Sequence, residues 1–404
     1  MVKNFKCPGC GATMEYDPQD GKMHCAFCKS SYEPDQIGRR ASSDDPPKIV
    51  AAERETARKQ ARIAVNVAVC NSCGAELAVN AVEASSFCPY CGNASVVMDR
   101  VEEQLAPDYI IPFKVSKEEA EGIIRKRLKS GFFVPKEVRD FELEKLNGVY
   151  IPFWLYEIYY GDDQIWSYRS FFSKHSIEER LVHDCVYHQL SVDASKRFED
   201  ASSQRLEPYD MRDLKEFDAA YLSGFYSDRF DVGTQEADMT ALGRAEKLFN
   251  EEVKDRISGS FANLQGTNPE KEVMSRNYAL LPVWFLTFQY KHRPYTLLVN
   301  GQTRKMVGTV PFDKKKALTI FLSLAAVLGL FFGIVGGGSL GALNSASPYE
   351  SGEGNLAFHI CWVLGNLLIW ALTIRKLFAI RRSFKLSRSR SNYKLAKERQ
   401  GIEG

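Results

Sequence analysis

The chain has 404 residues, of which 26% are charged, and its formal net charge is only +2 at pH 7. Its mean hydropathy is −0.28, which excludes a protein that lies mostly within a bilayer. Most of the chain is therefore expected to be soluble, and it is long enough for more than one folded unit.

Two identical cysteine patterns, each C-x2-C-x14-C-x2-C, begin 63 residues apart near the start of the chain. Two CxxC pairs at this separation are typical of a zinc ribbon, in which each pair forms a tight turn, or knuckle, and four thiolates hold one tetrahedral Zn²⁺. Because no coordination position is left open, both ions are predicted to be structural. The predicted ligands are Cys7, Cys10, Cys25 and Cys28, here called frame 1, and Cys70, Cys73, Cys88 and Cys91, here called frame 2.

Two other interpretations of the cysteines fit less well. Disulfides would require a secreted chain, and no apolar signal segment precedes the first cysteine. Redox CxxC motifs occur singly beside a βαβ pattern. The pairing stays open, since one knuckle of each frame could share an ion, but closing the shorter loop within a frame costs less entropy.

The segment between the frames is polar, and its Asp-Asp-Pro-Pro sequence at 44–47 breaks any helix. Residues 51–62 are expected to form a short charged helix that acts as a spacer. The two ribbons are thus expected to be separate units on a semi-flexible tether.

A folded body is expected over residues 101–313. Ser116 and Glu119 make a capping box, which predicts an amphipathic helix that ends at Gly131. Aromatic and branched residues predict strands at 149–160 and 279–290.

The two predicted strands align around Pro152 and Pro282, which suggests a duplicated β unit. Both are apolar on both faces, as is typical of central strands. Asn300-Gly301 predicts a hairpin with a type I′ turn. The body is therefore expected to be α+β and mostly antiparallel.

No catalytic residue is predicted, and the protein is not expected to be an enzyme, because the sequence lacks the common phosphate-loop, nucleophile-elbow and HExxH motifs. His183 and Cys185 share one face of a strand while His188 lies on the other. We interpret them as a core cysteine with two ordinary histidines. Asp162 and Asp163 are interpreted as a turn rather than a carboxylate pair.

Two long apolar runs follow the body, at 317–338 and 356–374. At about 1.5 Å per residue they reach roughly 33 and 28 Å, enough to cross a hydrocarbon core of about 30 Å. They predict a two-helix transmembrane hairpin over 314–375.

Basic residues predict the orientation of this hairpin. Lysines at 314–316 precede the first run, ten lysines and arginines follow the second, and the loop between the runs has neither. Since positive residues stay on the cytoplasmic side, a two-pass cell-membrane protein with both termini cytoplasmic is expected. The basic tail at 376–404 also suits anionic lipid, although a plain topology signal explains it equally well.

The predicted fold class is therefore multidomain. It comprises zinc ribbons at 1–37 and 65–100, a linker at 38–64, the α+β body at 101–313, the transmembrane hairpin at 314–375 and the basic tail at 376–404.

Several features together resemble a bacterial family of zinc-ribbon membrane proteins, often labelled TFIIB-type zinc ribbon or primosomal helicase-like. They are frame 1, the stretch YIIPFKVSKEEA at 109–120, YIPFW at 150–154, the LLPVW and LLVNGQT segments, and the terminal apolar pair. The resemblance spans nearly the whole chain. It implies a membrane-stress complex whose partners are phage-shock protein A and flotillin-like SPFH proteins. The helicase label does not fit, because the chain has no ATP-binding motif.

Two functions remain as hypotheses. The first is a membrane-anchored scaffold that recruits protein partners, and the alternative is a ribbon protein that binds nucleic acid. Phosphate neutralisation dominates nucleic-acid affinity, yet residues 70–97 contain no lysine or arginine and residues 7–32 contain two lysines against three acidic residues. Protein docking is therefore the prediction, and an enzyme in the body is a third hypothesis.

Overall fold

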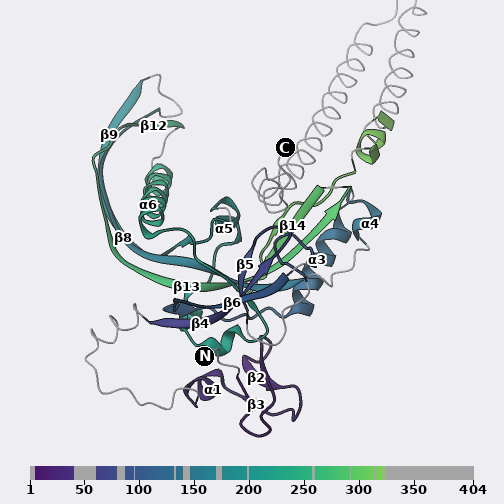
Figure 1. Cartoon of the computed structure of the whole chain (residues 1–404). Coiled ribbons are helices and arrows are strands. Elements are labelled where there is room, and N and C mark those ends of the chain that lie inside the picture. The colour runs from purple at the N-terminus through teal and green to yellow at the C-terminus, as the bar shows by residue number, and fades with distance from the viewer. Residues whose placement is uncertain are drawn as a thin grey trace, which may run out of the picture. The chain divides into compact units, whose positions relative to one another are not determined.

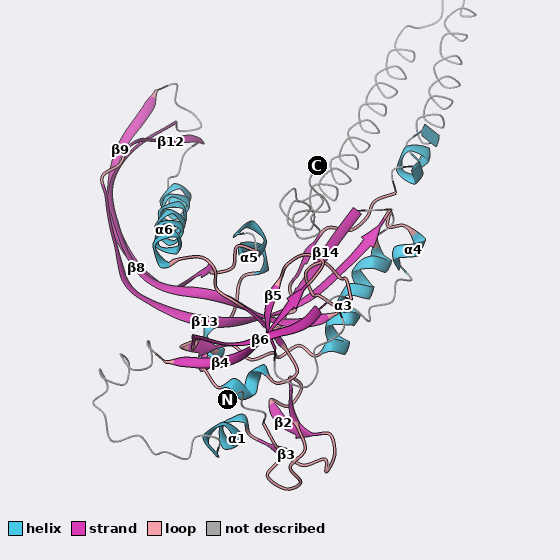
Figure 2. Ribbon diagram, viewed as in Figure 1, coloured by secondary structure: helices cyan, strands magenta, loops and turns pink. Residues whose placement is uncertain are grey.

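The computed structural model describes residues 5–323, with gaps at 41–60, 80–86, 95, 132, 140–145, 170–174, 198–199, 257–259, 292, 314 and 321. The described residues fall into two compact units. The first runs to Ile124 and again from 146 to Val307, and the second contains residues 125–139 and 308–323. Strands predominate among the described elements (Figures 1 and 2).

A 12-stranded sheet forms the centre of the first unit. Its strands are β4 (Arg62–Cys70), β5 (Glu76–Val79), β6 (Val96–Leu105), β7 (Tyr109–Ile110), β8 (Asn147–Arg169), β9 (Ser176–Asp193), β10 (Lys215–Glu216), β11 (Tyr226–Asp228), β12 (Ser260–Gly266), β13 (Pro269–Tyr290), β14 (Arg293–Asn300) and β15 (Met306–Gly308). The main path runs β10-β7-β13-β8-β11-β5-β4-β6, with β9 and β12 paired to β8 and with β14 paired to β13 and β15. Two of the pairs, β11 with β8 and β13 with β7, are parallel, and the long pairs that β8 and β4 form are antiparallel, so the sheet is mostly antiparallel.

The two segments predicted as central strands are neighbours in this sheet. β8 and β13 pair antiparallel, with Pro152 opposite Leu280 and Tyr150 opposite Pro282. The first ten residues of β8 are all buried, because both of its faces are covered there. The prediction that these segments are central strands is confirmed.

Helix α6 (Thr234–Arg256) covers the concave face of the long, curved part of β8, β9 and β13 (Figure 1). Register shifts after Tyr156 and Val273 interrupt the ladders of this part, and such bulges bend a sheet. The buried face of the helix repeats every fourth residue, and its small alanines let the helix lie close to the strands. These buried residues are Ala237, Ala241, Ala245, Phe249 and Val253.

The predicted capping-box helix is confirmed as α3 (Lys117–Ser130), where the Glu119 N–H donates to Ser116 Oγ at 3.2 Å. A small three-stranded sheet carries frame 1 and consists of β1 (Met14–Asp17), β2 (Lys22–Cys25) and β3 (Ser31–Tyr32). The remaining helices are α1 (Pro34–Arg40), α4 (Lys136–Arg139), α5 (Asp200–Leu206), η1 (Met211–Asp213) and η2 (Ala219–Leu222).

The turn after β14 differs from the prediction. A type I′ turn needs positive φ at both central residues, but the positive φ in this loop belongs to Arg304, at 63°, and not to Gly301. The Asn300 side chain stabilises a longer loop, since its Oδ1 accepts the N–H groups of Gln302 and Thr303 at 2.9 Å each. The type I′ prediction is wrong because this side chain replaces the backbone bond of a two-residue turn.

The predicted transmembrane hairpin needs correction. Within the described ranges, no helix combines the length and the apolar composition that a membrane crossing requires. The fold class with a two-helix membrane hairpin at 314–375, and the two-pass localisation derived from it, are therefore wrong for the part of the chain that the structure describes. Several predicted segments lie outside the described residues. They are most of the run at 317–338, the whole run at 356–374, the basic tail at 376–404 and residues 51–60 of the spacer helix predicted at 51–62. The end of that helix is wrong, because β4 begins at Arg62.

Replacing Gly301 with alanine tests the close packing of the loop that follows β14. A Cβ there would lie 2.6 Å from the Phe113 ring and 2.8 Å from Pro282 Cβ, so Gly301→Ala is expected to lower the free energy of unfolding by about 1–3 kcal/mol. Gly243→Ala on α6 is the matched control, because nothing lies within 4 Å of its Cβ position. Since alanine is the better helix former, this substitution is expected to raise the free energy of unfolding by about 0.5–1 kcal/mol. Urea denaturation followed by circular dichroism measures both. Equal effects would contradict the packing described here.

Candidate metal centres

All four CxxC knuckles share one backbone geometry. In each, the residue after the second cysteine donates its N–H to the carbonyl of the first cysteine, and the first cysteine donates to the carbonyl two residues beyond the second. These eight hydrogen bonds measure 2.7–3.0 Å. The residue after the second cysteine has φ between 61° and 75° in every knuckle, and it is Gly11, Lys29, Gly74 or Gly92. The repeated turn explains how short, similar sequences place two sulfur atoms side by side four times.

The four sulfur atoms of each frame lie within 4.8 Å of one another. The shortest Sγ–Sγ distances are 3.4 and 3.5 Å in frame 1 and 3.6 and 3.8 Å in frame 2. Sulfur ligands at about 2.3 Å around one tetrahedral ion are roughly 3.8 Å apart, so the geometry of both frames fits a bound metal ion. The structure thus brings together the predicted ligands within each frame, and the nine described cysteines are all free thiols.

Frame 1 is open to solvent on one side. Cys7 and Cys25 are buried, whereas Cys10 and Cys28 are exposed. The Ser30 Oγ lies 3.2 Å from Cys7 Sγ and 2.9 Å from Cys28 Sγ. Its hydrogen bond lowers the pKa of Cys7 to about 6 and also lowers the pKa of Cys28. Ser30 therefore favours the thiolate form, which is the form that binds metal.

Frame 1 is attached to the first unit through β1. The Ser223 Oγ donates to the Met14 carbonyl at 2.6 Å, and the Tyr16 ring packs edge-on against Tyr221 with centroids 5.2 Å apart. The Tyr16 hydroxyl donates to the Phe113 carbonyl at 3.5 Å. This attachment uses the hairpin and leaves the two knuckles of frame 1 on the exposed side.

Three of the four cysteines of frame 2 lie inside the hydrophobic core of the sheet, and the fourth, Cys73, is half-buried against it. Cys70 is 0% exposed and Cys88 and Cys91 are each 1% exposed. They belong to one apolar cluster with side chains from β5, β8, β13 and β14. The predicted boundary at residue 100 between the second ribbon and the body falls within β6. The strands β4 and β5, which flank the first knuckle of frame 2, are neighbours in the main sheet. Frame 2 is thus built into the sheet rather than attached to it by a tether.

The second knuckle of frame 2 rests directly on β13. Tyr90, between the two cysteines, is fully buried and packs edge-on against Phe285 with ring centroids 5.5 Å apart. The Thr287 Oγ1 donates to the Pro89 carbonyl at 3.0 Å. A Cβ on Gly92 would lie 2.6 Å from the Thr287 carbonyl oxygen, so only glycine permits this approach.

The first knuckle of frame 2 is held by a half-buried arginine that lies beside a buried carboxyl group. The Arg197 guanidinium donates to the Gly74 carbonyl at 3.2 Å and lies 3.9 Å from Asp228 Oδ1. The Ser195 Oγ donates to Asp228 Oδ2 at 2.6 Å, and Asp228 is 2% exposed. Burial raises the pKa of the Asp228 carboxyl above its usual value.

A third group, which the sequence analysis missed, lies at the hairpin tip of frame 1. Ligand atoms of Asp17, Asp20 and His24 lie within 4.8 Å of one another. However, His24 Nε2 already lies 2.7 Å from Asp20 Oδ2, and Asp17 Oδ1 accepts the Gln19 N–H at 2.8 Å. These bonds are those of an ordinary turn, so the group is no metal centre of its own.

The histidines and cysteine of β9 form no metal site within the described residues. His183 stacks on Phe249 with ring centroids 5.7 Å apart, His188 Nδ1 lies 3.6 Å from Glu157 Oε1, and Cys185 is half-buried. They are therefore structural or surface residues.

The interpretation of Asp162 and Asp163 as a turn is wrong, because β8 continues through both. Asp162 is buried and accepts hydrogen bonds from Thr267 and Asn268, whereas Asp163 pairs with Arg180. The two carboxylates serve separate structural roles.

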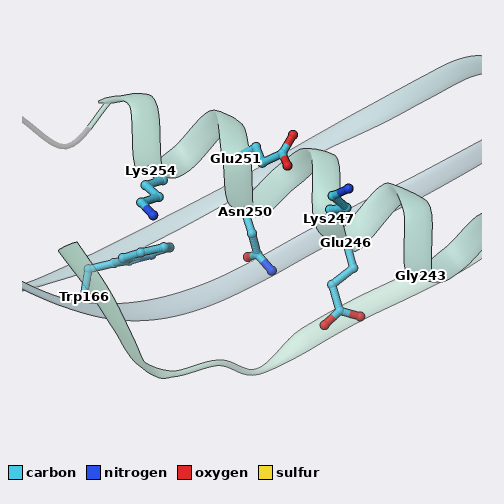
Figure 3. Close-up of a pocket in the computed structure, with 7 residues that line it drawn as sticks. All are labelled: Trp166, Gly243, Glu246, Lys247, Asn250, Glu251 and Lys254. Carbon is cyan, nitrogen blue, oxygen red and sulfur yellow. The ribbon is translucent and has the colours of Figure 1, made fainter. Parts of the chain in front are cut away.

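A pocket of about 340 Å³ lies between α6 and Trp166 of β8 (Figure 3). The Trp166 ring lies beneath the helix near Lys254, and Asn250 extends toward the sheet (Figure 3). The lining of the pocket contains no serine, cysteine or histidine. It consists of Trp166, Gly243, Glu246, Lys247, Asn250, Glu251 and Lys254. The ionisable groups of this pocket are carboxylates and amines.

Comparison with known proteins identifies one relative. The chain is 29% identical over 344 residues to a Bacillus subtilis (strain 168) protein described as the uncharacterized protein YdjG, and the match covers 80% of this chain and 95% of that one. No protein-family model matches the chain. No solved structure matches it either.

Matched serine substitutions test the different roles of the frames. Cys91→Ser is expected to destabilise the whole sheet, by an amount on the order of 5–10 kcal/mol, because metal binding at frame 2 contributes to folding. Cys28→Ser removes one ion but is expected to leave the unfolding of the sheet unchanged. Metal analysis and thermal unfolding of the purified variants measure both effects. Equal destabilisation by the two substitutions would contradict this assignment.

Replacing Asp228 with asparagine tests the buried carboxyl. Since its pKa is raised on folding, its contribution to stability is complete below the usual aspartate pKa and is lost as the pH rises through the raised value. Asp228→Asn removes the ionisation and keeps an acceptor for Ser195. Urea denaturation should therefore show the variant gaining stability over the wild type as the pH rises from about 4, the usual aspartate pKa. A difference that does not change with pH would contradict this expectation.

Proposed function

We propose that the protein is a zinc-ribbon scaffold that recruits protein partners and has no catalytic activity of its own. The observation that carries this proposal is the contrast between the frames. One knuckle geometry occurs four times, but the second knuckle of frame 2 is buried against the sheet, whereas both knuckles of frame 1 are exposed, at residues 8–11 and 26–29. Frame 1 therefore offers the larger exposed knuckle surface for recruitment.

The bound ions in this proposal are two structural Zn²⁺. Four thiolates in tetrahedral arrangement suit zinc or iron and disfavour magnesium and calcium, which prefer oxygen ligands. Four protein ligands leave no position for a reacting water, which argues for a structural rather than a catalytic ion. Metal analysis that found iron together with a visible thiolate–iron absorption would overturn the choice of zinc.

Charge supports protein partners rather than nucleic acid. Residues 5–40 carry five basic residues, namely Lys6, Lys22, Lys29, Arg39 and Arg40, against five acidic ones, namely Glu15, Asp17, Asp20, Glu33 and Asp35. A nucleic-acid interface needs a basic excess to neutralise phosphates. The partners implied by the family resemblance, phage-shock protein A and flotillin-like SPFH proteins, are the first to test.

The test is recovery of crosslinked partners with the full chain, comparing the wild type with Cys10→Ser/Cys28→Ser. Frame 1 is expected to lose its ion while the sheet stays folded, and specific protein partners should be lost with it. Val182→Ala is the control, because Val182 is 74% exposed and lies on β9, outside both frames. Recovery of the same proteins by wild type and variant, or recovery of nucleic acid instead of protein, would contradict the proposal.

A further inference from the structure

The two frames carry an aromatic residue at the same position of the same knuckle. Phe27 precedes Cys28 and Tyr90 precedes Cys91, and the backbone hydrogen bonds around them match. Their surroundings are opposite, because Tyr90 is 0% exposed whereas Phe27 is 81% exposed. No other large hydrophobic side chain in the described part of the chain is as exposed as Phe27.

Frame 2 shows what this position of the knuckle binds. Its aromatic ring contacts a second aromatic ring, Phe285, on a central strand. The carbonyl beside it, that of Pro89, accepts a hydrogen bond from the Thr287 hydroxyl on the same strand. Alternate residues of one strand therefore supply an apolar contact and a polar donor to one knuckle.

We propose that Phe27 is the anchor of a docking site for a protein partner, and that the partner supplies an apolar pocket on a β-sheet of its own. This inference rests on the proposed function and names the surface that performs it. The partner's pocket receives Phe27 as Phe285 receives Tyr90. A donor beside that pocket bonds the Ala26 carbonyl, which corresponds to the carbonyl of Pro89. A buried aromatic in such a pocket is the usual energetic centre of an interface.

One difference between the knuckles predicts the charge of the partner. Frame 2 has Gly92 where frame 1 has Lys29, and both adopt positive φ. Gly92 lets the Thr287 carbonyl come close, whereas the Lys29 side chain would block a backbone at that point. Lys29 is exposed and makes no ion pair within the described ranges. The partner therefore carries a carboxylate, rather than a close backbone carbonyl, beside its apolar pocket.

Docking at Phe27 would also cover the exposed side of frame 1. Phe27 is adjacent in sequence to Cys28, and Cys28 Sγ lies in the same sulfur cluster as Cys10 Sγ, the other exposed ligand. A bound partner would exclude water and chelator from these two sulfurs. Partner binding is therefore expected to slow the loss of metal from frame 1 and to leave frame 2 unaffected.

The test places a photo-crosslinking residue in the full chain inside cells. Phe27→p-benzoylphenylalanine is expected to give discrete protein adducts, with the crosslinked partner peptide in an apolar strand that carries an acidic residue. The same substitution at Val182, which is 74% exposed on β9, is the control for general exposure. Purified partner, identified by the adduct, is then used for binding measurements.

In those measurements Phe27→Ala is expected to weaken binding about tenfold or more, while Phe27→Tyr stays within about twofold. Lys29→Glu is expected to weaken binding and Lys29→Arg to preserve it. All four variants should keep two ions and the wild-type unfolding midpoint, because Phe27 and Lys29 are exposed. Phe27→Ala with full binding, while Cys10→Ser/Cys28→Ser loses it, would overturn this inference and leave the proposed function standing.

Other outcomes are equally decisive. Adducts to a second copy of this chain, or adducts removed by nuclease, would show a different occupant and overturn the inference. If every frame 1 variant kept all of its partners, the proposed function would be overturned as well.

Discussion

The contact between the Cys88–Gly92 knuckle and β13 is the constraint on which the rest of the structure depends. β13 is the strand that β7, β8 and β14 all pair with. The knuckle reaches it through Tyr90 on Phe285, through Thr287 and through the close approach at Gly92. Three of the four cysteines of frame 2 belong to the apolar cluster of the sheet, and Cys73 packs against it. An ion bound by these four sulfurs would therefore couple metal binding to formation of the core in this part of the chain.

The two frames show how one local structure takes two roles. Their cysteine spacing and backbone hydrogen bonds are the same, so the local sequence builds the same candidate metal site twice. The residues beside the ligands decide what each site contacts. Tyr90 and Gly92 allow the second frame to be buried, whereas Phe27 and Lys29 keep an aromatic ring and a charge at the surface of the first. In the proposed function, one motif thus supplies both a buried structural site and an exposed recruitment surface.

Local signals in the sequence predicted the metal ligands, the capping-box helix and the two central strands, because spacing, capping and apolar patterns act over a few residues. The position of frame 2 was not predictable in this way. β5 pairs with β11, whose residues lie almost 150 positions later in the chain, and nothing near the cysteines encodes that pairing. Helix α6 was also missed, because three of its five buried residues are alanines that give a weak apolar pattern. The predictions of a type I′ turn at Asn300 and of a turn at Asp162 were wrong for a related reason. In both places the side chain makes hydrogen bonds that the local composition does not reveal.

Amide hydrogen exchange after selective metal removal tests the central role of frame 2 most directly. The full chain would be followed by mass spectrometry before and after a chelator removes first the exposed ion and then the buried one. Loss of the first ion should leave β13 and β8 protected, and loss of the second should release protection over β4, β5 and β13 together. Retained protection of β13 after both ions have gone would contradict the account.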